Sequence, residues 1–510
     1  MGGLQFDAII VGIGPAGAVI AEGLSGAGWK VLGLEEGPWY NPFRDFREGR
    51  ATRAPIGITF APDNEVRPGI VKAVGGGMVF YAGVFFRLHE SDFRTSSRFA
   101  CGADWPLNYQ ELAPYYDKVE IFTGASGSNT NIFEAPRGPY PNPPHPLSRG
   151  SHYFVKGAQA CSFHPAITPM SILSRPYRGR PACTYCAKCG WGCMIGDKSS
   201  PEMTYVPSAV NNGADIRPRN KVITIETDRI GRVTGVVFKD QDGVMQKAGS
   251  DLVVLCGGTI LNPLILKRSR GPAHPDGLGA RSGLVGGNLM GHVGGRYLAR
   301  FPEVVNGYMG ISGGANVQDF YDRPRDADFH RGYTIYVSLL PEPPESFAGE
   351  YLENWGDELV EIMNSYNRII RLAILGEDQA NPENCVIPDP DKKDEDGLPL
   401  ARVRYRRSEN EIRLFRHAVE TSRQICRAGG ADNWEFYHDS NSTAHPLGTC
   451  RMGNDPGKSV VDHWGACYDV PGLYIMDSSV FPTSGAVNPA LTIMALASRT
   501  ADHLIKRRKG

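Results

Sequence analysis

The chain has 510 residues, a formal net charge of −1 and 41% hydrophobic residues. That length accommodates two domains, or one large domain with a substantial insertion. Because Lys and Arg are not in excess, the chain has no electrostatic footprint for nucleic acid, and we expect no nucleic-acid partner. The longest apolar run, residues 252–266, is broken by glycine and proline and is too short for a membrane-spanning helix, so no direct membrane span is expected.

The first residues show no targeting segment. The chain enters an apolar stretch almost at once, without a basic leader or a small-residue cleavage site. We therefore expect a cytoplasmic protein, with the periplasm as the alternative if a partner subunit carries an export signal.

The opening of the chain predicts a nucleotide-binding β-α-β unit. Residues 6–24 have the pattern of an apolar strand, a glycine turn and a helix, and a second strand is predicted over residues 30–37. Gly12, Gly14 and Gly17 form the pattern G-x-G-x-x-G at the junction of strand and helix. Glycines there permit a tight turn and let backbone N–H groups approach a pyrophosphate at the helix N-terminus.

A carboxylate ends the second predicted strand. Glu35 follows the glycines at about the 20-residue distance typical of the acid that binds ribose hydroxyls. Glu36 is the competing candidate. The motif by itself does not distinguish FAD from NAD.

Four cysteines crowd into residues 183–193. Cys183, Cys186, Cys189 and Cys193 give C-x2-C-x2-C-x3-C, the spacing of bacterial ferredoxin loops that ligate iron–sulfur clusters. A disulfide framework would spread its cysteines along the chain, so the spacing favours metal ligation. Structural zinc and free thiols are the alternatives.

The other segments predict a layered α/β fold with an insertion. Residues 134–150 contain six prolines and predict an extended surface excursion. Residues 296–439 mix aromatic β-like runs with amphipathic helical runs, which predicts a second, substrate-facing domain. Further strands are predicted within 214–228, 233–240, 251–258 and 472–479, and a helix over 488–505.

Three stretches make the sequence similar to the glucose-methanol-choline (GMC) oxidoreductase family, FAD enzymes that oxidise alcohols. They are VGGGMVFYAG (residues 74–83), STAHPLGTCRMG (442–453) and GLYIMDSSVFPTSGAVNPALTIMALA (472–497). The resemblance extends over essentially the whole chain. It implies an α/β fold: a Rossmann-like FAD-binding domain and an inserted α+β substrate-binding domain built on an antiparallel sheet.

The resemblance also implies how the chain is divided. The discontinuous FAD-binding domain is expected at residues 1–100, 200–295 and 440–510. The substrate-binding domain is expected at 101–199 and 296–439, with the Cys-rich loop at 183–193.

The resemblance assigns roles to two polar residues near the C-terminus. Oxidation of an alcohol needs a base beside the hydroxyl while a hydride leaves the carbon for the flavin. His445 matches the family's catalytic histidine, and imidazole suits a base because its pKa lies near working pH. Asn488 matches the family's second catalytic position, and it would also suit the cap of the helix that follows. His292 and His438 match no role, so structural or surface positions are expected for them.

Further positions match the family's cofactor contacts. FAD is expected to be bound non-covalently, since the usual attachment motif is not evident. The resemblance places these residues against it, with Val222 contacting adenine through its backbone and Asp477 near the ribityl and phosphate: Gly75, Gly76, Gly77, Val222, Asp477 and Pro489.

The family members most similar in these motifs are bacterial sugar dehydrogenases and pyranose or glycoside 3-oxidases. The expected reaction is oxidation of a secondary hydroxyl of a sugar or glycoside to a ketone. A sterol or long-chain alcohol oxidase and a non-redox flavoprotein lyase are the alternatives. If the cysteines hold an iron–sulfur cluster, a small subunit or a cytochrome would accept the electrons.

Overall fold

A five-stranded parallel sheet forms one side of the protein. The computed structural model describes residues 4–46, 57–322, 327–340, 347–348 and 356–509. The strand order is β20-β11-β2-β3-β7, and every neighbouring pair is parallel. The strands are β2 (Ala8–Val11), β3 (Val31–Leu34), β7 (Asp215–Arg217), β11 (Val253–Leu255) and β20 (Leu473–Ile475). All residues of β2, β3, β11 and β20 are buried, as expected for a parallel sheet covered on both faces.

The predicted strand, turn and helix at the start of the chain are confirmed. Helix α1 (Pro15–Gly26) follows β2 directly and has proline in its first turn, where no N–H partner is needed. The second strand is shorter than predicted, because its pairing with β2 ends at Leu34. Glu35 therefore lies just past the carboxyl end of β3.

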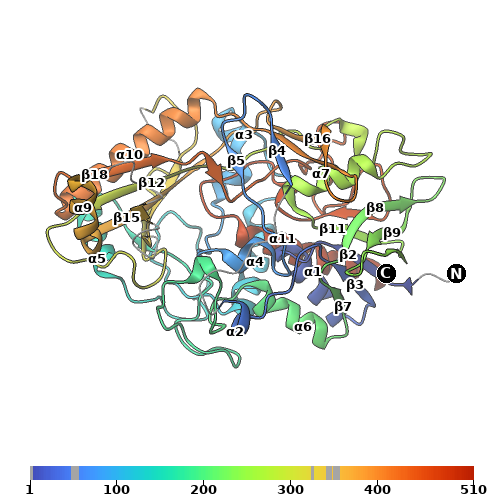
Figure 1. Ribbon diagram of the computed structural model, residues 1–510, viewed down its shortest axis with the longest axis horizontal. Helices are drawn as coiled ribbons and strands as arrows, with labels where there is room; N and C mark the ends of the chain where they lie inside the picture. The colour runs from blue at the N-terminus through green and yellow to red at the C-terminus, as the bar shows by residue number, and fades with distance from the viewer. Residues whose placement is uncertain (1–3, 47–56, 323–326, 341–346, 349–355, 510) are drawn as a thin grey trace.

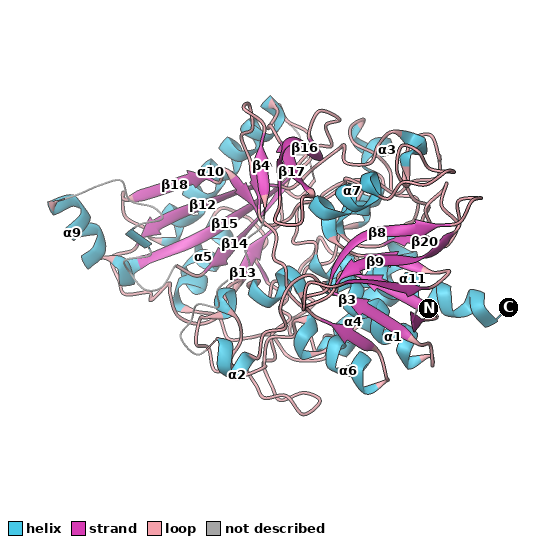
Figure 2. Ribbon diagram, turned by 45° about the vertical axis from the view of Figure 1, so that its right-hand side comes forward, coloured by secondary structure: helices cyan, strands magenta, loops and turns pink. Residues whose placement is uncertain are grey.

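Helices and a second, smaller sheet surround the parallel sheet (Figures 1 and 2). Helix α1 packs against α6 and α11, and α11 also contacts α4. These helices are α4 (Tyr109–Thr123), α6 (Tyr205–Asn211) and α11 (Ala490–Lys509). The smaller sheet has the order β1-β10-β9-β8, with β1 (Leu4–Gln5), β8 (Lys221–Thr227), β9 (Val233–Lys239) and β10 (Met245–Gly249).

An antiparallel six-stranded sheet forms the other side of the protein, on the left in Figure 1. Its order is β18-β12-β15-β14-β13-β6. The strands are β6 (Ala166–Ile167), β12 (His292–Arg300), β13 (Ala315–Val317), β14 (Tyr333–Ser338), β15 (Ile369–Glu377) and β18 (Glu435–Asp439). Helices α5 (Arg149–Ala160) and α10 (Glu409–Gly429) pack on it and on each other.

The two faces of this sheet differ in chemistry. One face joins α5 and α10 in an apolar cluster that includes Val293, Tyr297 and Ile374. The alternation along β12 turns Arg296 to the opposite face. Arg296 and Tyr336 both pair with Ala373 between them, so the three side chains form a row on that face. The small central residue leaves space above the sheet.

The remaining elements are short. Two small sheets have the orders β16-β17-β4 and β19-β5. Their strands are β4 (Ile58–Phe60), β5 (Arg67–Pro68), β16 (Cys385–Lys393), β17 (Pro399–Arg404) and β19 (Ser442–Thr443). The other helices are α2 (Pro42–Asp45), α3 (Thr95–Phe99), α7 (Gly258–Arg268) and α9 (Asp357–Asn364), and the 3₁₀ turns are η1 (Gly76–Phe80), η2 (Glu90–Phe93), η3 (Cys189–Trp191), η4 (Pro201–Met203), η5 (Ala280–Ser282), η6 (Tyr366–Arg368) and η7 (Ser478–Val480). In the described part of the chain, no helix has the length and apolar character needed to cross a bilayer.

The architecture is the expected one, a Rossmann-like layered domain joined to a domain built on an antiparallel sheet. The proline-rich segment before α5 has no helix until Arg149, as predicted. Helix α4 falls within the predicted substrate-binding segment 101–199 but packs against α11. The exact domain boundaries stay a prediction.

Candidate active site

A cavity of about 850 Å³ lies where the parallel strands end and the antiparallel sheet begins. This size falls within the range of about 300–1,000 Å³ typical of small-molecule sites. The strand ends after β2, β3, β11 and β20 line one side, and Arg296 and Tyr336 line the other. Ligands of open α/β sheets bind at such carboxyl ends.

Most of the predicted site residues meet in this cavity. Its lining includes Gly12, Gly14, Glu35, Gly76, Gly77, Val222, His445, Asp477, Asn488 and Pro489. Gly17 and Gly75 are not part of the lining. They support the turns on which the other glycines lie.

The glycine positions are dictated by close backbone contacts. Gly12 has φ +92°, and a Cβ there would lie 2.4 Å from the Cys256 carbonyl oxygen. A Cβ on Gly17 would lie 2.0 Å from the Gly12 carbonyl oxygen, so the helix could not begin so close to the strand. The N–H of Gly75 donates to the Ile13 carbonyl at 2.7 Å and joins the two glycine loops. The cavity wall there is bare backbone, which suits a pyrophosphate.

Glu35 is the acid that the backbone holds in place. Its carboxylate accepts the N–H groups of Ile13 and Gly37, each at 2.9 Å. Burial raises the pKa of Glu35 to about 7, although both N–H groups oppose this rise. Glu36 instead forms an ion pair with Lys72 at 2.7 Å. Both carboxylates line the cavity, and the assignment of Glu35 to a ribose stays a prediction.

Asp477 organises a second set of backbone donors. It accepts the N–H groups of Gly258 at 2.7 Å and Ser479 at 2.8 Å, and the amide of Asn262 at 2.8 Å. The carboxylate therefore holds the first turns of α7 and η7 together at the cavity. Its direct contact with a cofactor stays a prediction, as does the backbone contact of Val222, whose carbonyl accepts Arg268 Nη2 at 2.8 Å.

His445 is paired with a second histidine that the sequence did not single out. The Nδ1 atoms of His445 and His292 lie 3.1 Å apart, and the two ring planes are nearly perpendicular, at 86°. His292 is 2% exposed, so the surface alternative is wrong for it, whereas a structural position agrees with its burial. The candidate base therefore has a polar partner on the side away from the cavity.

The electrostatics keep both imidazoles neutral. Burial lowers the pKa of His445 to about 4, and the nearby positive charge of Arg296 acts in the same direction. Burial also lowers the pKa of His292 well below its ordinary value, and His445 adds to this effect. A neutral imidazole has one unprotonated nitrogen and can accept a proton. The arrangement suits a base at neutral pH.

Asn488 keeps its amide oxygen free. The Oδ1 atom is buried and has no hydrogen-bond partner, although only Pro489 separates the residue from the start of α11. A helix cap would have used this oxygen to accept an N–H. The structure therefore does not support the capping interpretation. A buried acceptor without a hydrogen-bond partner costs folding free energy. The free Oδ1 therefore indicates that a ligand in the cavity donates a hydrogen bond to it.

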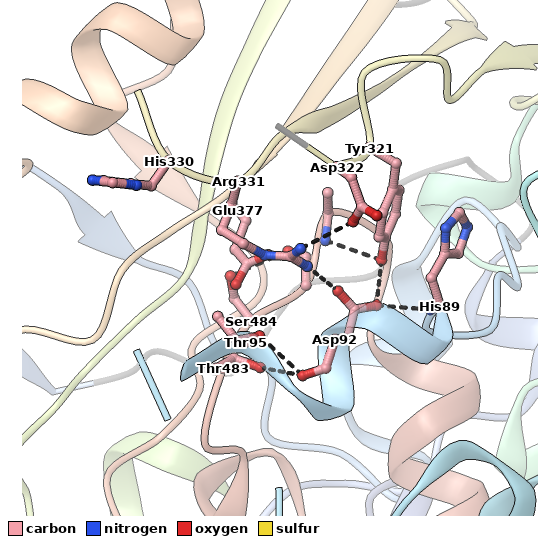
Figure 3. A network of polar contacts seen from close by, with 12 residues as sticks. His89, Asp92, Thr95, Tyr321, Asp322, His330, Arg331, Glu377, Thr483 and Ser484 are labelled. Atoms are coloured by element: carbon pink, nitrogen blue, oxygen red, sulfur yellow. Dashed lines mark hydrogen bonds and ion pairs between the residues drawn. The ribbon is translucent and has the colours of Figure 1, made fainter. Parts of the chain in front are cut away.

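The loop that leads to Asn488 is anchored by a buried ion network, shown in Figure 3. Arg331 has a completely buried side chain and pairs with Asp92 and, at 2.6 Å, with Glu377. Tyr321 donates its hydroxyl to Asp92 at 2.6 Å and accepts the Ala486 N–H at 3.3 Å. Because the loop backbone is tied to these fixed charges, the position of Asn488 depends on them.

The four clustered cysteines do not converge on a common centre. The Cys193 thiol donates to Asp197 Oδ1 at 2.7 Å, and Cys186 is exposed. Burial raises the pKa of Cys189 to about 12 and also raises that of Cys183, which disfavours their thiolate forms. Within the described residues, which include this loop, no group of three Cys, His, Asp or Glu side chains is arranged to hold a metal ion. The structure thus gives no support to the predicted metal site at Cys183, Cys186, Cys189 and Cys193.

A buried lysine holds this loop instead. Lys198 Nζ donates to the carbonyls of Cys189 at 2.7 Å and Val79 at 2.8 Å. The ammonium group thereby joins the Cys-rich loop to η1. Spacing of cysteines alone could not reveal this contact.

Sequence reasoning missed two residues of β12: Arg296, which lines the cavity, and His292, which contacts His445 from behind. The run HVGGRYLAR alternates, and this alternation places His292 and Arg296 on one face of a strand. That signal was available. What the sequence could not show is that this face meets His445.

Comparisons with known proteins identify the family of the chain. A family model described as GMC oxidoreductase matches residues 6–294, and a second with the same description matches residues 385–497. A 2-methyl-1,2-propanediol dehydrogenase of Mycolicibacterium austroafricanum is 32% identical over 99% of this chain and 96% of its own length. Fructose dehydrogenase large subunit of Gluconobacter japonicus is 28% identical over 98% of each chain. Paromamine 6'-oxidase of Streptomyces fradiae is 29% identical, covering 97% of this chain and 90% of its own.

The fold is also shared with a solved enzyme. A formate oxidase of Aspergillus oryzae RIB40, studied for FAD modification, superposes with a TM-score of 0.70 at 15% identity. The match covers 100% of this chain and 99% of that one.

We expect Arg296→Gln to raise the pKa of His445 above about 4. Loss of the cation removes repulsion on the imidazolium, but burial persists, so the pKa stays below the ordinary value of about 6.5. An NMR titration of ¹⁵N-histidine-labelled protein measures it. Arg98→Gln, at a side chain 52% exposed, is the control and should leave it unchanged. An unaltered titration in Arg296→Gln would show that the guanidinium does not act on the ring.

We expect Arg331→Met to lower the free energy of unfolding by about 3–5 kcal/mol, because Asp92 and Glu377 would be left buried without a cation. Urea denaturation measures the difference. Arg98→Met removes an exposed partner that lies 3.6 Å from Asp322, a residue that Arg331 also contacts. That control should cost less than about 1 kcal/mol. Equal losses in the two variants would refute the importance of burial.

Proposed function

Because this chain belongs to the GMC oxidoreductase family, we propose that it binds FAD non-covalently and oxidises a secondary hydroxyl of a sugar or glycoside to a ketone. The proposal rests on one observation. His445 and Asn488 line the same cavity as the glycine turns. The enzyme is an oxidoreductase that acts on CH–OH groups. The proposal adds non-covalent FAD, a sugar or glycoside as the substrate, and the roles of His445 and Asn488.

The cavity residues fit FAD. Gly12, Gly14 and Gly76 present bare backbone for the pyrophosphate, and Glu35 lies where a ribose would follow. Asn488, with its unpartnered Oδ1, and His445 line the same cavity. When bound, FAD would supply the acceptor for the hydride.

His445 and Asn488 would divide the remaining chemistry. His445 Nε2 is the ring nitrogen not engaged by His292, and it would accept the hydroxyl proton. The Asn488 amide would orient the same hydroxyl and steady the charge that develops on its oxygen. Arg296, near His445, would add a positive charge that stabilises an alkoxide.

The polar face of the six-stranded sheet supports a hydroxyl-rich substrate. Arg296 and Tyr336 line the cavity, and the Nε atom of Arg296 is buried without a hydrogen-bond partner. A ligand with several hydroxyls would satisfy such donors, whereas a sterol would leave them unpaired. The relatives named for fructose and paromamine lend support to the same choice.

The relative named as a large subunit supports a further proposal, that electrons leave through a protein partner. A small subunit or a cytochrome would serve this role. Since the cysteine loop shows no arranged metal ligands among the described residues, we do not assign an iron–sulfur cluster to that path.

We expect anaerobic addition of sugars and glycosides to bleach the flavin absorption of the holoenzyme. His445→Asn should slow this flavin reduction by roughly 10²–10⁴-fold, because a general base usually contributes that much to the rate. Stopped-flow absorbance measures the rate, and the retained flavin spectrum reports bound FAD. His152→Asn, an exposed histidine on α5, is the control and should reduce at the parental rate.

Two results would count against the proposal. Equal reduction rates in His445→Asn and the parent would remove the base assignment. Reduction by sterols or long-chain alcohols, but by no sugar, would replace the substrate class.

A further inference from the structure

We propose that His292 is a positioning residue that fixes the tautomer of His445. It holds the proton of His445 on Nδ1, so that Nε2 faces the cavity as an acceptor. The role of His445 as a base rests on the proposed function, whereas the tautomer itself can be measured without turnover.

The pairing of the two histidines is built into the backbone. Met290 and Leu447 form an antiparallel bridge, in which each N–H donates to the other's carbonyl, at 3.0 and 2.9 Å. In an antiparallel register, the residue two after Met290 lies opposite the residue two before Leu447. These residues are His292 and His445. The bridge therefore brings the two backbones together at this point, and the side-chain rotamers complete the contact between the rings.

The contact requires a single proton between the two rings. The Nδ1 atoms are 3.1 Å apart, a hydrogen-bond distance, and both rings have their pKa lowered. Two neutral imidazoles can share such a bond in two ways. Either His445 donates from Nδ1 and keeps Nε2 free, or His292 donates and His445 carries its proton on Nε2. Only the first arrangement leaves a base at the cavity.

The surroundings of His292 select the first arrangement. His292 Nε2 is buried, and no donor reaches its lone pair, while the backbone carbonyls of Ser484, Gly485 and Val487 act on the ring to favour its protonated form. A carbonyl only accepts, so the nitrogen on that side is best protonated. His292 then carries its proton on Nε2, and its Nδ1 must accept from His445.

The arrangement also supports the ring after the proton has moved. When Nε2 of His445 takes a hydroxyl proton, the ring becomes a cation with protons on both nitrogens. Its Nδ1–H still points at the lone pair of His292 Nδ1, and a hydrogen bond from a charged donor is stronger than the neutral one. A buried carboxylate holds the base in the same way in serine proteases. Here an imidazole would do so without adding negative charge to the site.

The carbonyls that face His292 belong to the loop tied down by the Arg331 network. Val487 directly precedes Asn488, so one short segment positions the free amide and selects the tautomer of the histidine pair. This coupling explains why the loop is anchored to buried charges.

The test compares His292→Phe with His292→Asn in the holoenzyme. Phenylalanine fills the space but accepts no hydrogen bond, whereas the Asn oxygen takes the place of Nδ1. In the parent, ¹⁵N NMR of labelled histidine should show His445 protonated on Nδ1, with its signal assigned by loss in His445→Asn. In His292→Phe the Nδ1–H form should no longer dominate, and in His292→Asn it should persist.

Kinetics give a second readout. His292→Phe should lower kcat for flavin reduction by roughly 10–100-fold, with KM within about twofold, and His292→Asn should recover most of the rate. His274→Phe is the matched control: His274 is 8% exposed, its Nε2 lies 3.1 Å from the Gly231 carbonyl, and it does not line the cavity. The His274→Phe variant should change neither the tautomer of His445 nor kcat for flavin reduction.

The outcomes separate this inference from the proposed function. An Nε2–H tautomer for His445 in the parent, or an unchanged tautomer in His292→Phe, overturns the inference. Loss of FAD and of thermal stability to the same degree in both His292 variants assigns His292 a structural role and also overturns it. If no alcohol reduces the parent enzyme while the tautomers behave as expected, the proposed function falls and the positioning role stands.

Discussion

The bridge between Met290 and Leu447 is the contact on which the site depends. It fastens the residues just before β12 to the segment that carries His445, which itself lies beside the ends of the parallel strands. Neither sheet alone forms the cavity. The substrate side comes from β12 and β14, and the nucleotide side comes from the glycine turns, so the bridge fixes the distance between them.

Burial determines the charge state of the cavity. It raises the pKa of Glu35 to about 7 and lowers that of His445 to about 4. Both shifts favour the neutral form, because a charge is poorly solvated away from water. Arg296 then acts on a buried, neutral His445, where its field is felt at short range with little screening.

The sequence revealed what local patterns encode. The β-α-β unit was predictable because a buried strand, a glycine turn and a helix leave signals within a few residues of one another. His445 and Asn488 were found because they lie in motifs shared with a family. His292 was missed, because its significance comes from a register between segments far apart in the chain. The cysteine spacing predicted metal ligation, but Lys198 and Asp197 engage that loop through contacts that spacing does not encode.

The sheet order also has a consequence for how the protein is made. Strand β20, residues 473–475, pairs with β11, which pairs with β2 near the start of the chain. A ribosome would therefore release the early strands long before their last neighbour exists. Until then, an edge of apolar backbone stays open, and contacts of this sequence separation form slowly. Nascent chains of this enzyme should need protection from aggregation until the final strand and α11 have emerged.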